Sequence, residues 1–242
     1  SIAVDGSGNV YTTGYFKDTV DFNPNAGTTN LTSPFASEVF IQKLDSAGNF
    51  LWAKNVGGAT SDAYGIALGL DDSSNIYITG RFNGTGDFDP GAGIDNHQAA
   101  GTAGGMDVFV WKLMDNGDYH WTITMGSTDT DDSGLSVDLG PSDEIYVAGL
   151  YNGTVDFDPG PGVSNLTSAG ATDGFNMKLT PCVPSGLTPD VASLGNLIGE
   201  CSVAAPSPPT ASGNCGGTYS GTPNVTFPIT TQGTTTVTWT YD

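Results

Sequence analysis

The chain has 242 residues, 26 of them acidic and only 6 basic, which gives a formal net charge of −20 at pH 7. This balance repels nucleic acid and anionic membrane surfaces, so neither is an expected partner. No stretch approaches the roughly 18 consecutive apolar residues of a membrane-spanning helix. The 35 glycines and 14 prolines, and the lack of a long run at helical apolar spacing, predict an all-β chain of short strands and many turns.

One stretch of sequence occurs three times without a gap, at residues 10–27, 76–93 and 145–162. Each copy has a Tyr, a Gly, a Thr, an Asp-Phe pair, a Pro and a closing Gly. The Tyr and Asp-Phe positions are Tyr11, Asp21 and Phe22; Tyr77, Asp87 and Phe88; and Tyr146, Asp156 and Phe157. Long-period self-similarity of β-type segments predicts an array of blades or a solenoid.

The copies also share a two-residue turn signal, which reads Asn83-Gly84 and Asn152-Gly153 in two of them and Lys17-Asp18 in the first. Asn-Gly between apolar runs is a strong signal for a tight hairpin, since both residues can adopt positive φ. We therefore expect a strand, a two-residue turn and a short return strand in each copy, ending in an Asp-x-Pro loop.

The strands expected from alternating apolar residues form an antiparallel meander, which is how a propeller blade is built. In the first repeat they span 2–4, 10–14, 19–22, 39–44 and 50–54; in the second 66–70, 76–82, 85–88, 108–113 and 119–124; in the third 135–139, 145–151, 154–157 and 175–179. The third repeat lacks the strand that carries Trp52 and Trp121. We therefore expect the last two to three blades of a larger ring, within a longer precursor.

The repeats resemble a known family. Residues 8–14 read Gly-Asn-Val-Tyr-x-Thr-Gly, residues 87–91 read Asp-Phe-Asp-Pro-Gly, and residues 39–44 and 108–113 read Val-Phe-x-x-Lys-Leu before a Trp strand. This pattern resembles the SBBP-type β-propeller repeats of secreted bacterial proteins. The resemblance implies a partial β-propeller over residues 1–179 and an exported protein, and it brings no catalytic residues with it.

The remaining sequence has a different character. After an expected linker at 180–186, residues 187–242 resemble a hyalin-repeat (HYR-like) module, on the strength of Gly199-Glu200-Cys201, Asn214-Cys215 and the Thr-rich run 232–242. The resemblance implies a partial Ig-like β-sandwich in a surface protein. In such an exported setting we expect a disulfide between Cys201 and Cys215, with Cys182 left over.

The residues with catalytic potential carry no motif. His97 lies in a loop-like stretch, His120 takes a position that is Leu51 in the first repeat, and neither is part of a nucleophile or zinc pattern. Asp129, Asp131 and Asp132 form an acidic loop without the spacing of an EF-hand. No Gly-rich stretch leads from a strand into a helix, so a phosphate cradle is not expected.

Aspartates at alternate positions of the repeated loop have three possible roles. Asp87 with Asp89, and Asp156 with Asp158, could supply hard oxygen ligands to Ca²⁺. Alternatively, these side chains accept hydrogen bonds from nearby backbone N–H groups and hold the loop. A third interpretation is a glycosidase that uses a pair of carboxylates, whose separation the sequence does not give.

Three lysines occupy the same position of the repeat, namely Lys43, Lys112 and Lys178, and they are half of the basic residues. We predict a structural ion pair for each, because an unpaired buried charge is costly. The expected partners are carboxylates of the same blade, with Asp21, Asp87 and Asp156 as first candidates. The alternative is a strand-edge Lys that prevents edge-to-edge pairing.

Taken together, these patterns predict a non-enzymatic, secreted or cell-surface scaffold or adhesion protein. The recurring residues are those that shape blades, whereas the segments 28–37, 94–106 and 163–172 differ most between copies. Loops on a stiff scaffold vary without loss of fold, so these segments are the expected contacts with other extracellular proteins or glycans. The alternative is a carbohydrate-active propeller enzyme with paired aspartates.

Overall fold

The computed structural model of the chain divides into two units, Ser1–Thr180 and Pro181–Asp242. It describes residues 1–58, 61–101, 104–128, 131–141, 143–160 and 162–180 of the first unit, and residues 188–189, 208, 210–212, 218–220, 222–228 and 235–240 of the second. Within these ranges every regular element is a strand, so the all-β prediction is confirmed. No helix among them has the length and apolar character needed to cross a membrane.

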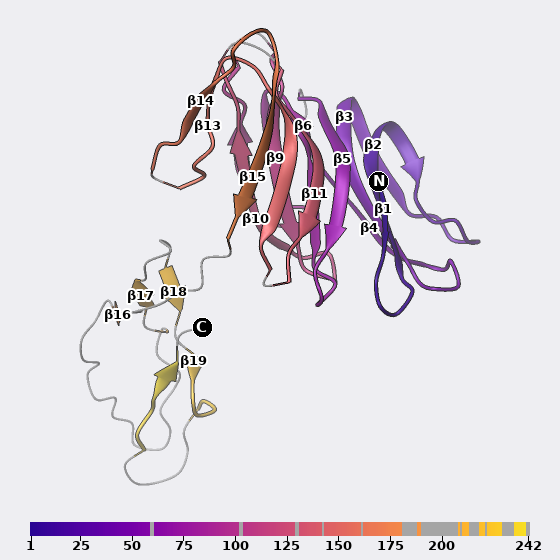
Figure 1. Cartoon of the computed structure of the whole chain (residues 1–242). Coiled ribbons are helices and arrows are strands. Elements are labelled where there is room, and N and C mark those ends of the chain that lie inside the picture. The colour runs from indigo at the N-terminus through magenta and orange to yellow at the C-terminus, as the bar shows by residue number, and fades with distance from the viewer. Residues whose placement is uncertain are drawn as a thin grey trace. The chain divides into compact units, whose positions relative to one another are not determined.

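The first unit contains three antiparallel sheets that lie side by side in chain order (Figure 1). Sheet I consists of β1 (Ile2–Val4), β2 (Val10–Asp21), β3 (Asn30–Leu44) and β4 (Phe50–Val56). Sheet II consists of β5 (Ala63–Leu70), β6 (Ile76–Phe82), β9 (Asp107–Leu113) and β10 (Tyr119–Met125). Sheet III consists of β11 (Ser133–Leu139), β12 (Ile145–Tyr151) and β15 (Asp173–Leu179), and within the described residues it has no fourth strand.

The hairpin predicted at Asn-Gly is wrong. Strand β6 pairs with β9, while β7 (Thr85–Asp87) pairs with β8 (Asn96–Gln98). Only the second turn residue has positive φ, 62° at Gly84 and 70° at Gly153, whereas a type I′ turn needs it at both. The chain therefore kinks instead of reversing. In sheet I, where Asp18 has φ of 62°, strand β2 continues through the kink with a shift in register.

Each kink leads into a two-stranded extension, here called a ribbon. Ribbon 1 pairs residues 18–21 of β2 with residues 30–33 of β3, ribbon 2 is β7 with β8, and ribbon 3 is β13 (Thr154–Asp156) with β14 (Asn165–Thr167). The segments 28–37, 94–106 and 163–172, expected to be loops, thus supply the return strand of each ribbon.

The two faces of each sheet have different roles, because side chains alternate along a strand. The Tyr face carries the repeated Tyr and Lys, and the Phe face carries Phe40, Phe109 or Phe175. One core joins the Tyr face of sheet I (Tyr11, Val39 and Ile41) to the Phe face of sheet II (Leu68, Ile76, Ile78, Phe109, Trp111 and Leu113). A second joins Tyr77, Val108 and Val110 of sheet II to Val137, Ile145, Val147, Phe175 and Met177 of sheet III.

These cores hold the sheets together. Each large apolar side chain buried there contributes about 1.5–3 kcal/mol relative to leaving it in water. Trp111, Phe109, Ile76 and Ile78 are fully buried, so the junction between sheets I and II alone accounts for a large share of the stability.

The second unit contains two small sheets within its described residues. One has the order β16 (Thr188–Pro189), β17 (Thr210–Ser212) and β18 (Thr218–Ser220), and the other pairs β19 (Thr222–Pro223) with β20 (Trp239–Thr240). Cys182, Cys201 and Cys215 lie outside the described residues, so the predicted disulfide does too. The same holds for Asp129 and for residues 181–186 of the expected linker.

Candidate functional site: ribbon loops, acidic turns and sheet junctions

The ribbon loops are closed by the first Asp of the repeated Asp-Phe pair. Asp87 Oδ1 accepts the backbone N–H of Asp89 at 3.0 Å and that of Asp95 at 2.8 Å. The other ribbons repeat this: Asp21 Oδ1 accepts from Asn23 and Thr29 at 3.0 and 2.8 Å, and Asp156 Oδ1 from Asp158 and Ser164 at 3.0 and 2.8 Å. One carboxylate oxygen thus fixes both ends of each loop.

The second acidic position explains the closing Gly of the repeat. Asp89 Oδ1 accepts the Gly91 N–H at 2.7 Å, which turns the other oxygen towards Gly93. A Cβ added at Gly93 would lie 2.0 Å from Asp89 Oδ2, and one at Gly162 would lie 2.0 Å from Asp158 Oδ2. A residue with a Cβ at either position would therefore displace the carboxylate.

The four aspartates considered as calcium ligands, Asp87, Asp89, Asp156 and Asp158, each accept backbone N–H groups within their own loops. The N–H groups of Ser164 and Asp158 lower the pKa of Asp156, because they stabilise its charged form. No group of three or more acidic, His or Cys side chains suited to a metal occurs in the described part of the chain. The geometry is that of a side chain holding a turn.

The Phe of each Asp-Phe pair anchors its ribbon to the sheet. Phe88 packs edge-on against Phe82 at 5.2 Å between ring centroids and also contacts Phe109 at 5.2 Å. The same three-ring cluster occurs as Phe16, Phe22 and Phe40, and as Tyr151, Phe157 and Phe175. Such pairs add about 0.5–1.5 kcal/mol beyond area burial, so the ribbons are held rigidly at their bases.

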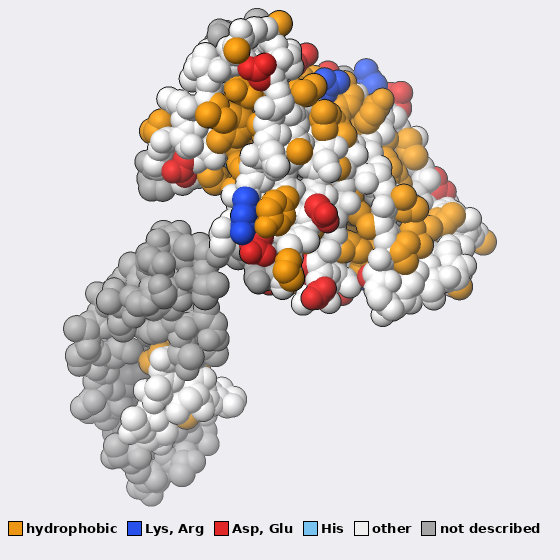
Figure 2. Space-filling model, in the orientation of Figure 1, with side chains coloured by type: hydrophobic (Ala, Val, Ile, Leu, Met, Phe, Trp, Pro, Cys, Tyr) orange, Lys and Arg blue, Asp and Glu red, His pale blue; other side chains and the backbone are white. Residues whose placement is uncertain are grey.

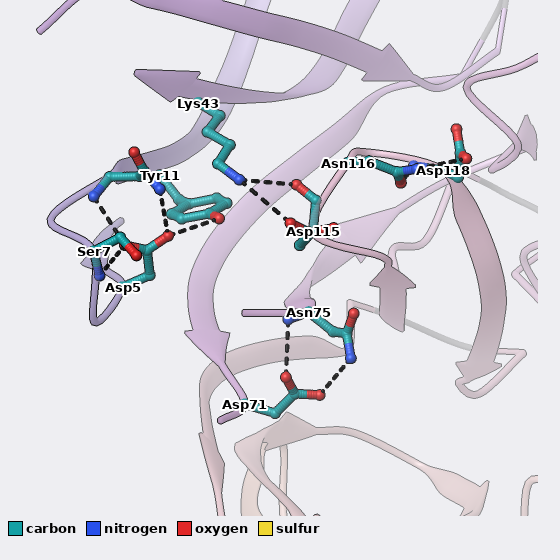
Figure 3. Close-up of polar contacts among 10 residues, drawn as sticks. Asp5, Ser7, Tyr11, Lys43, Asp71, Asn75, Asp115, Asn116 and Asp118 are labelled. Carbon is teal, nitrogen blue, oxygen red and sulfur yellow. Dashed lines mark hydrogen bonds and ion pairs between the residues drawn. The ribbon is translucent and has the colours of Figure 1, made fainter. Parts of the chain in front are cut away.

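At the other end of the sheets, two tight turns share an Asp–Asn–Tyr arrangement. Asp71 Oδ1 accepts the N–H groups of Ser73 and Asn75 at 2.9 and 2.8 Å, and Oδ2 accepts Asn75 Nδ2 at 2.9 Å and the Tyr77 hydroxyl at 3.2 Å. Asp5, Asn9 and Tyr11 repeat these contacts, and the Asp45–Asn49 turn has them without a Tyr. Figure 3 shows Asp5 beside Tyr11 and Asp71 beside Asn75.

These tyrosines are structural. Burial, and then the negative charge of Asp5 and Asp71, raise the pKa of Tyr11 and of Tyr77 well above the usual value. Each therefore remains a neutral hydroxyl that donates to its Asp. The signal, Asp followed four residues later by Asn and two after that by Tyr, is visible in the sequence at 5–11 and 71–77 but was not used in the prediction.

Of the three lysines on the Tyr faces, Lys178 has the predicted ion pair with a carboxylate of its own blade, whereas Lys43 pairs with a carboxylate of the next sheet. Lys43 Nζ lies 3.7 Å from Asp115 Oδ2 and donates to the Asp115 carbonyl at 3.2 Å, in a turn of the next sheet (Figure 3). Lys178 Nζ pairs with Glu144 of its own repeat at 3.1 Å. Within the described residues Lys112 forms no ion pair, and its Nζ lies 4.8 Å from the Tyr77 ring centroid. The partners are thus not Asp21, Asp87 or Asp156, because those carboxylates close the ribbon loops.

Contact with the ring of the repeated Tyr is what the three lysines share. The Nζ-to-centroid distance is 4.8 Å for Lys43 over Tyr11 and 5.6 Å for Lys178 over Tyr146. A cation over an aromatic face contributes about 0.5–1 kcal/mol when exposed and more when desolvated. Lys43 has a side chain only 9% exposed, so its contact with the neighbouring sheet belongs to the junction between sheets I and II.

A further acidic position links consecutive sheets. Asp62 Oδ1 accepts the Ser37 N–H at 2.8 Å, and Asp131 Oδ1 accepts the Met106 N–H at 3.0 Å. Each acceptor lies just before the first strand of its own sheet. The donor lies in the preceding sheet, within β3 for Ser37 and directly before β9 for Met106. Asp131, one of the aspartates of the acidic loop, thus has a structural role between sheets II and III.

Two carboxylates are buried together at the junction of sheets II and III. Asp107 is 3% exposed and Asp132 is 0% exposed. Asp132 accepts the N–H groups of Ser127 and Asn152, both at 2.7 Å. Asp107 Oδ2 accepts the N–H of Ala100 at 2.6 Å, whereas its Oδ1 has no hydrogen-bond partner among the described residues. Burial, reinforced by the charge of Asp132, raises the pKa of Asp107 to about 6.

Within the described part of the chain, neither His97 nor His120 lies in an arrangement suited to catalysis. His97, on ribbon 2, has Nε2 2.8 Å from Asp95 Oδ2 and Nδ1 3.4 Å from Thr124 Oγ1. The last distance exceeds the reach expected of a base on its nucleophile, and the matching positions of ribbons 1 and 3 are Leu31 and Leu166. Burial, and then the charge of Lys112, lower the pKa of His120, which keeps that imidazole neutral.

The ribbons also carry exposed apolar side chains that differ between repeats. Ile94 is 77% exposed, Val163 is 72% exposed and Leu166 is 49% exposed. All three lie in the segments predicted as binding surfaces, and all stand on a base held by the three-ring cluster.

Comparison with known proteins gives two partial matches. No family model matches the chain. The regulatory protein FlaEY of Caulobacter vibrioides is 31% identical over 142 residues, which are 57% of this chain and 14% of that protein. The uncharacterized WD repeat-containing protein L264 of Acanthamoeba polyphaga mimivirus is 24% identical over 221 residues, which are 81% of this chain and 15% of that protein. The chain spans only these small shares of both relatives.

Proposed function

We propose that residues 1–179 are blades of an incomplete β-propeller in a non-enzymatic, secreted or cell-surface scaffold. Consecutive antiparallel sheets that pack face to face in chain order support the propeller, as does similarity to a protein named for WD repeats. Residues 187–242 are proposed as a partial Ig-like, HYR-like module. The proposed Cys201–Cys215 disulfide would suit such an exported module.

The observation that carries the scaffold proposal is how the repeated polar side chains are used. Asp21, Asp87 and Asp156 close loops, and Tyr11 and Tyr77 donate to turn carboxylates. Each repeated group thus has a partner inside the fold. The residues that differ between repeats lie on the ribbons and are exposed. Binding of other extracellular proteins or glycans is therefore proposed for the ribbons.

The alternative, a glycosidase with paired aspartates, needs two carboxylates that a substrate can reach. Asp107 and Asp132 do converge, but both are buried. The ribbon aspartates recur once per sheet, and acidic side chains lie scattered over the face drawn in Figure 2. This arrangement favours the scaffold over the enzyme.

The test is a paired binding and hydrolysis assay. The purified chain is applied to immobilised polysaccharides of bacterial surfaces, and retention and release of reducing ends are measured together. We expect retention without hydrolysis, and weaker retention for Ile94→Ser with Val163→Ser at an unchanged melting temperature. As a matched control, Leu135→Ser, an exposed position of β11 outside the ribbons, should bind normally. Hydrolysis that is lost in Asp87→Asn would refute the proposal.

A further inference from the structure

The stack of sheets has two uncovered faces. The Tyr face of sheet I covers the Phe face of sheet II, and the Tyr face of sheet II covers the Phe face of sheet III. Within the described residues, the Phe face of sheet I and the Tyr face of sheet III have no such cover. The residues on each uncovered face can be compared with those of the equivalent covered face, which indicates the kind of surface that could pack on it.

The Phe face of sheet I retains the apolar residues of a buried face. Pairing between strands places Ile2, Val4, Val10, Phe40 and Leu44 on it. The matching residues are Leu68, Leu70, Ile76, Phe109 and Leu113 in sheet II, and Val137, Leu139, Ile145, Phe175 and Leu179 in sheet III. Ile2 is 66% exposed and Val4 is 60% exposed, whereas Leu68 is 7% exposed.

Two polar residues on this face are compatible with burial. Thr12 and Gln42 stand where sheet II has Ile78 and Trp111. Thr12 Oγ1 donates to Gln42 Oε1 at 3.2 Å, and Gln42 Nε2 donates to the Phe22 carbonyl. Their polar groups have partners within the sheet, which limits the cost of covering them.

The Tyr face of sheet III lacks two of the apolar side chains that make the other junctions, although Leu150 stands on it where sheet II has Arg81. Gly174 and Asn176 replace Val108 and Val110 of sheet II, which are 1% and 0% exposed. Tyr146 is 38% exposed, against 1% for Tyr77. The Lys178–Glu144 ion pair lies on the same face. This face is therefore less apolar than the Tyr faces that make the junctions of sheets I, II and III.

We propose that the Phe face of sheet I is a docking surface for the Tyr face of a further repeat of the same kind. The occupant presents a Tyr, a Thr two residues on, two aliphatic residues and a Lys, as sheets I and II do with Tyr11 and Tyr77. A second copy of this chain fits poorly, because the free Tyr face that it offers carries Gly174 and Asn176.

The curated relatives support an occupant within the same polypeptide. The matches span 14% and 15% of those proteins, so both carry much more chain than the matched region. The inference rests on the equivalence of the sheets and goes beyond the proposed binding function, so failure of the polysaccharide assay leaves it standing.

The test adds a repeat to the protein. A copy of residues 1–66 is placed before Ser1, which reproduces the sequence context of the junction between sheets I and II. We expect the melting temperature to rise by roughly 10 °C, since residues such as Ile2 and Val4 become buried. Amide hydrogen exchange in the original β1 and β2 should slow. Sedimentation should show a monomer before and after the addition.

A pair of substitutions gives the matched control. Ile2→Asp with Val4→Asp should hardly change the melting temperature of the original chain, where both side chains are exposed, and should remove most of the gain in the extended chain. An unchanged melting temperature and unchanged exchange after addition would overturn the proposal. Concentration-dependent dimers of the original chain that Ile2→Asp abolishes would overturn it too, because a second copy would then be the occupant.

Discussion

The buried Asp107 should make the fold less stable at neutral than at mildly acidic pH. Its side chain is 3% exposed, Oδ1 has no hydrogen-bond partner in the part of the chain that the structure describes, and Asp132 lies close enough for its charge to add to the effect of burial. Both causes penalise the carboxylate relative to the neutral acid. Replacement by Asn retains the shape of the side chain and removes the charge.

The size of the effect follows from linkage. The pKa of Asp107 is raised from 3.8 to about 6. The folded state therefore holds a proton that the unfolded chain releases between these values, and stability falls as pH rises through this window. At about 1.4 kcal/mol per pKa unit, the carboxylate costs on the order of 3 kcal/mol at pH 7. Burial also raises the pKa of Asp132, so its contribution has the same sign.

The measurement is urea unfolding at pH values from 4 to 7. Asp107→Asn should be more stable than the unmodified chain at pH 7, by on the order of 1–3 kcal/mol, and should show a shallower loss of stability with rising pH. Asp173→Asn serves as the control, since Asp173 takes the matching place in β15 and is partly exposed. If Asp107→Asn is less stable at pH 7 and retains the full pH slope, the reasoning is refuted.

Four further outcomes are expected. Asp71→Ala should lower the free energy of unfolding by about 1–3 kcal/mol, because four hydrogen bonds are lost. The loss should be smaller for Asp45→Ala, since Asp45 has no Tyr partner. Equal losses in urea unfolding would contradict the role of Tyr77. Gly93→Ala should destabilise by about 1–2 kcal/mol through its clash with Asp89, whereas Gly6→Ala, with open space around it, should not. Lys43→Met should weaken the fold more than Lys178→Met, since Lys43 is the more buried; the reverse order of melting temperatures would count against the sheet-junction role. Chelation with EDTA should leave the melting temperature unchanged, because Asp87 and Asp156 already bind backbone N–H groups, and a drop that Ca²⁺ restores would revive the calcium interpretation.

The strands inside the sheets could be predicted from sequence because they bury one or both faces. The expected strands 76–82 and 145–151 coincide with β6 and β12, where alternating apolar residues fill the two cores. The ribbon strands β8 and β14 were missed. They are short and mostly exposed, so burial leaves no pattern on their sequence. These strands form because the Asp87 or Asp156 carboxylate closes the ribbon loop through hydrogen bonds to backbone N–H groups.

Local turn chemistry was predicted at the correct residues but with the wrong geometry. Asn83-Gly84 does place a residue in the left-handed region, yet only Gly84 adopts it. A dipeptide signal cannot distinguish a kink from a reversal, because the outcome depends on which strand the following residues meet. That choice is made by Phe88, which packs on Phe82 and Phe109 and carries the chain outward into the ribbon.

The partners of Lys43 and Asp131 could not be predicted because they lie on a different sheet. Repeats reveal which residues are equivalent, and they say nothing about the register at which one sheet lies on the next. Lys43 meets Asp115 only once the packing of Trp111 and Leu113 sets the register of sheet II on sheet I. Asp131 likewise meets the backbone of Met106 only once side chains such as Val110 and Val147 pack between sheets II and III.

The acidic composition has a structural origin in this fold. A meander of short strands has many turns, and each turn leaves backbone N–H groups without a partner in the ladder. Carboxylates are strong acceptors for such groups. Two of them are accepted by each of six aspartates, namely Asp5, Asp45, Asp71, Asp21, Asp87 and Asp156. The backbone and side-chain donors also lower the pKa of Asp21 and Asp45, which keeps these acceptors charged. Because each added repeat brings its own set of turns, the negative charge grows with the number of repeats and requires no acidic ligand site.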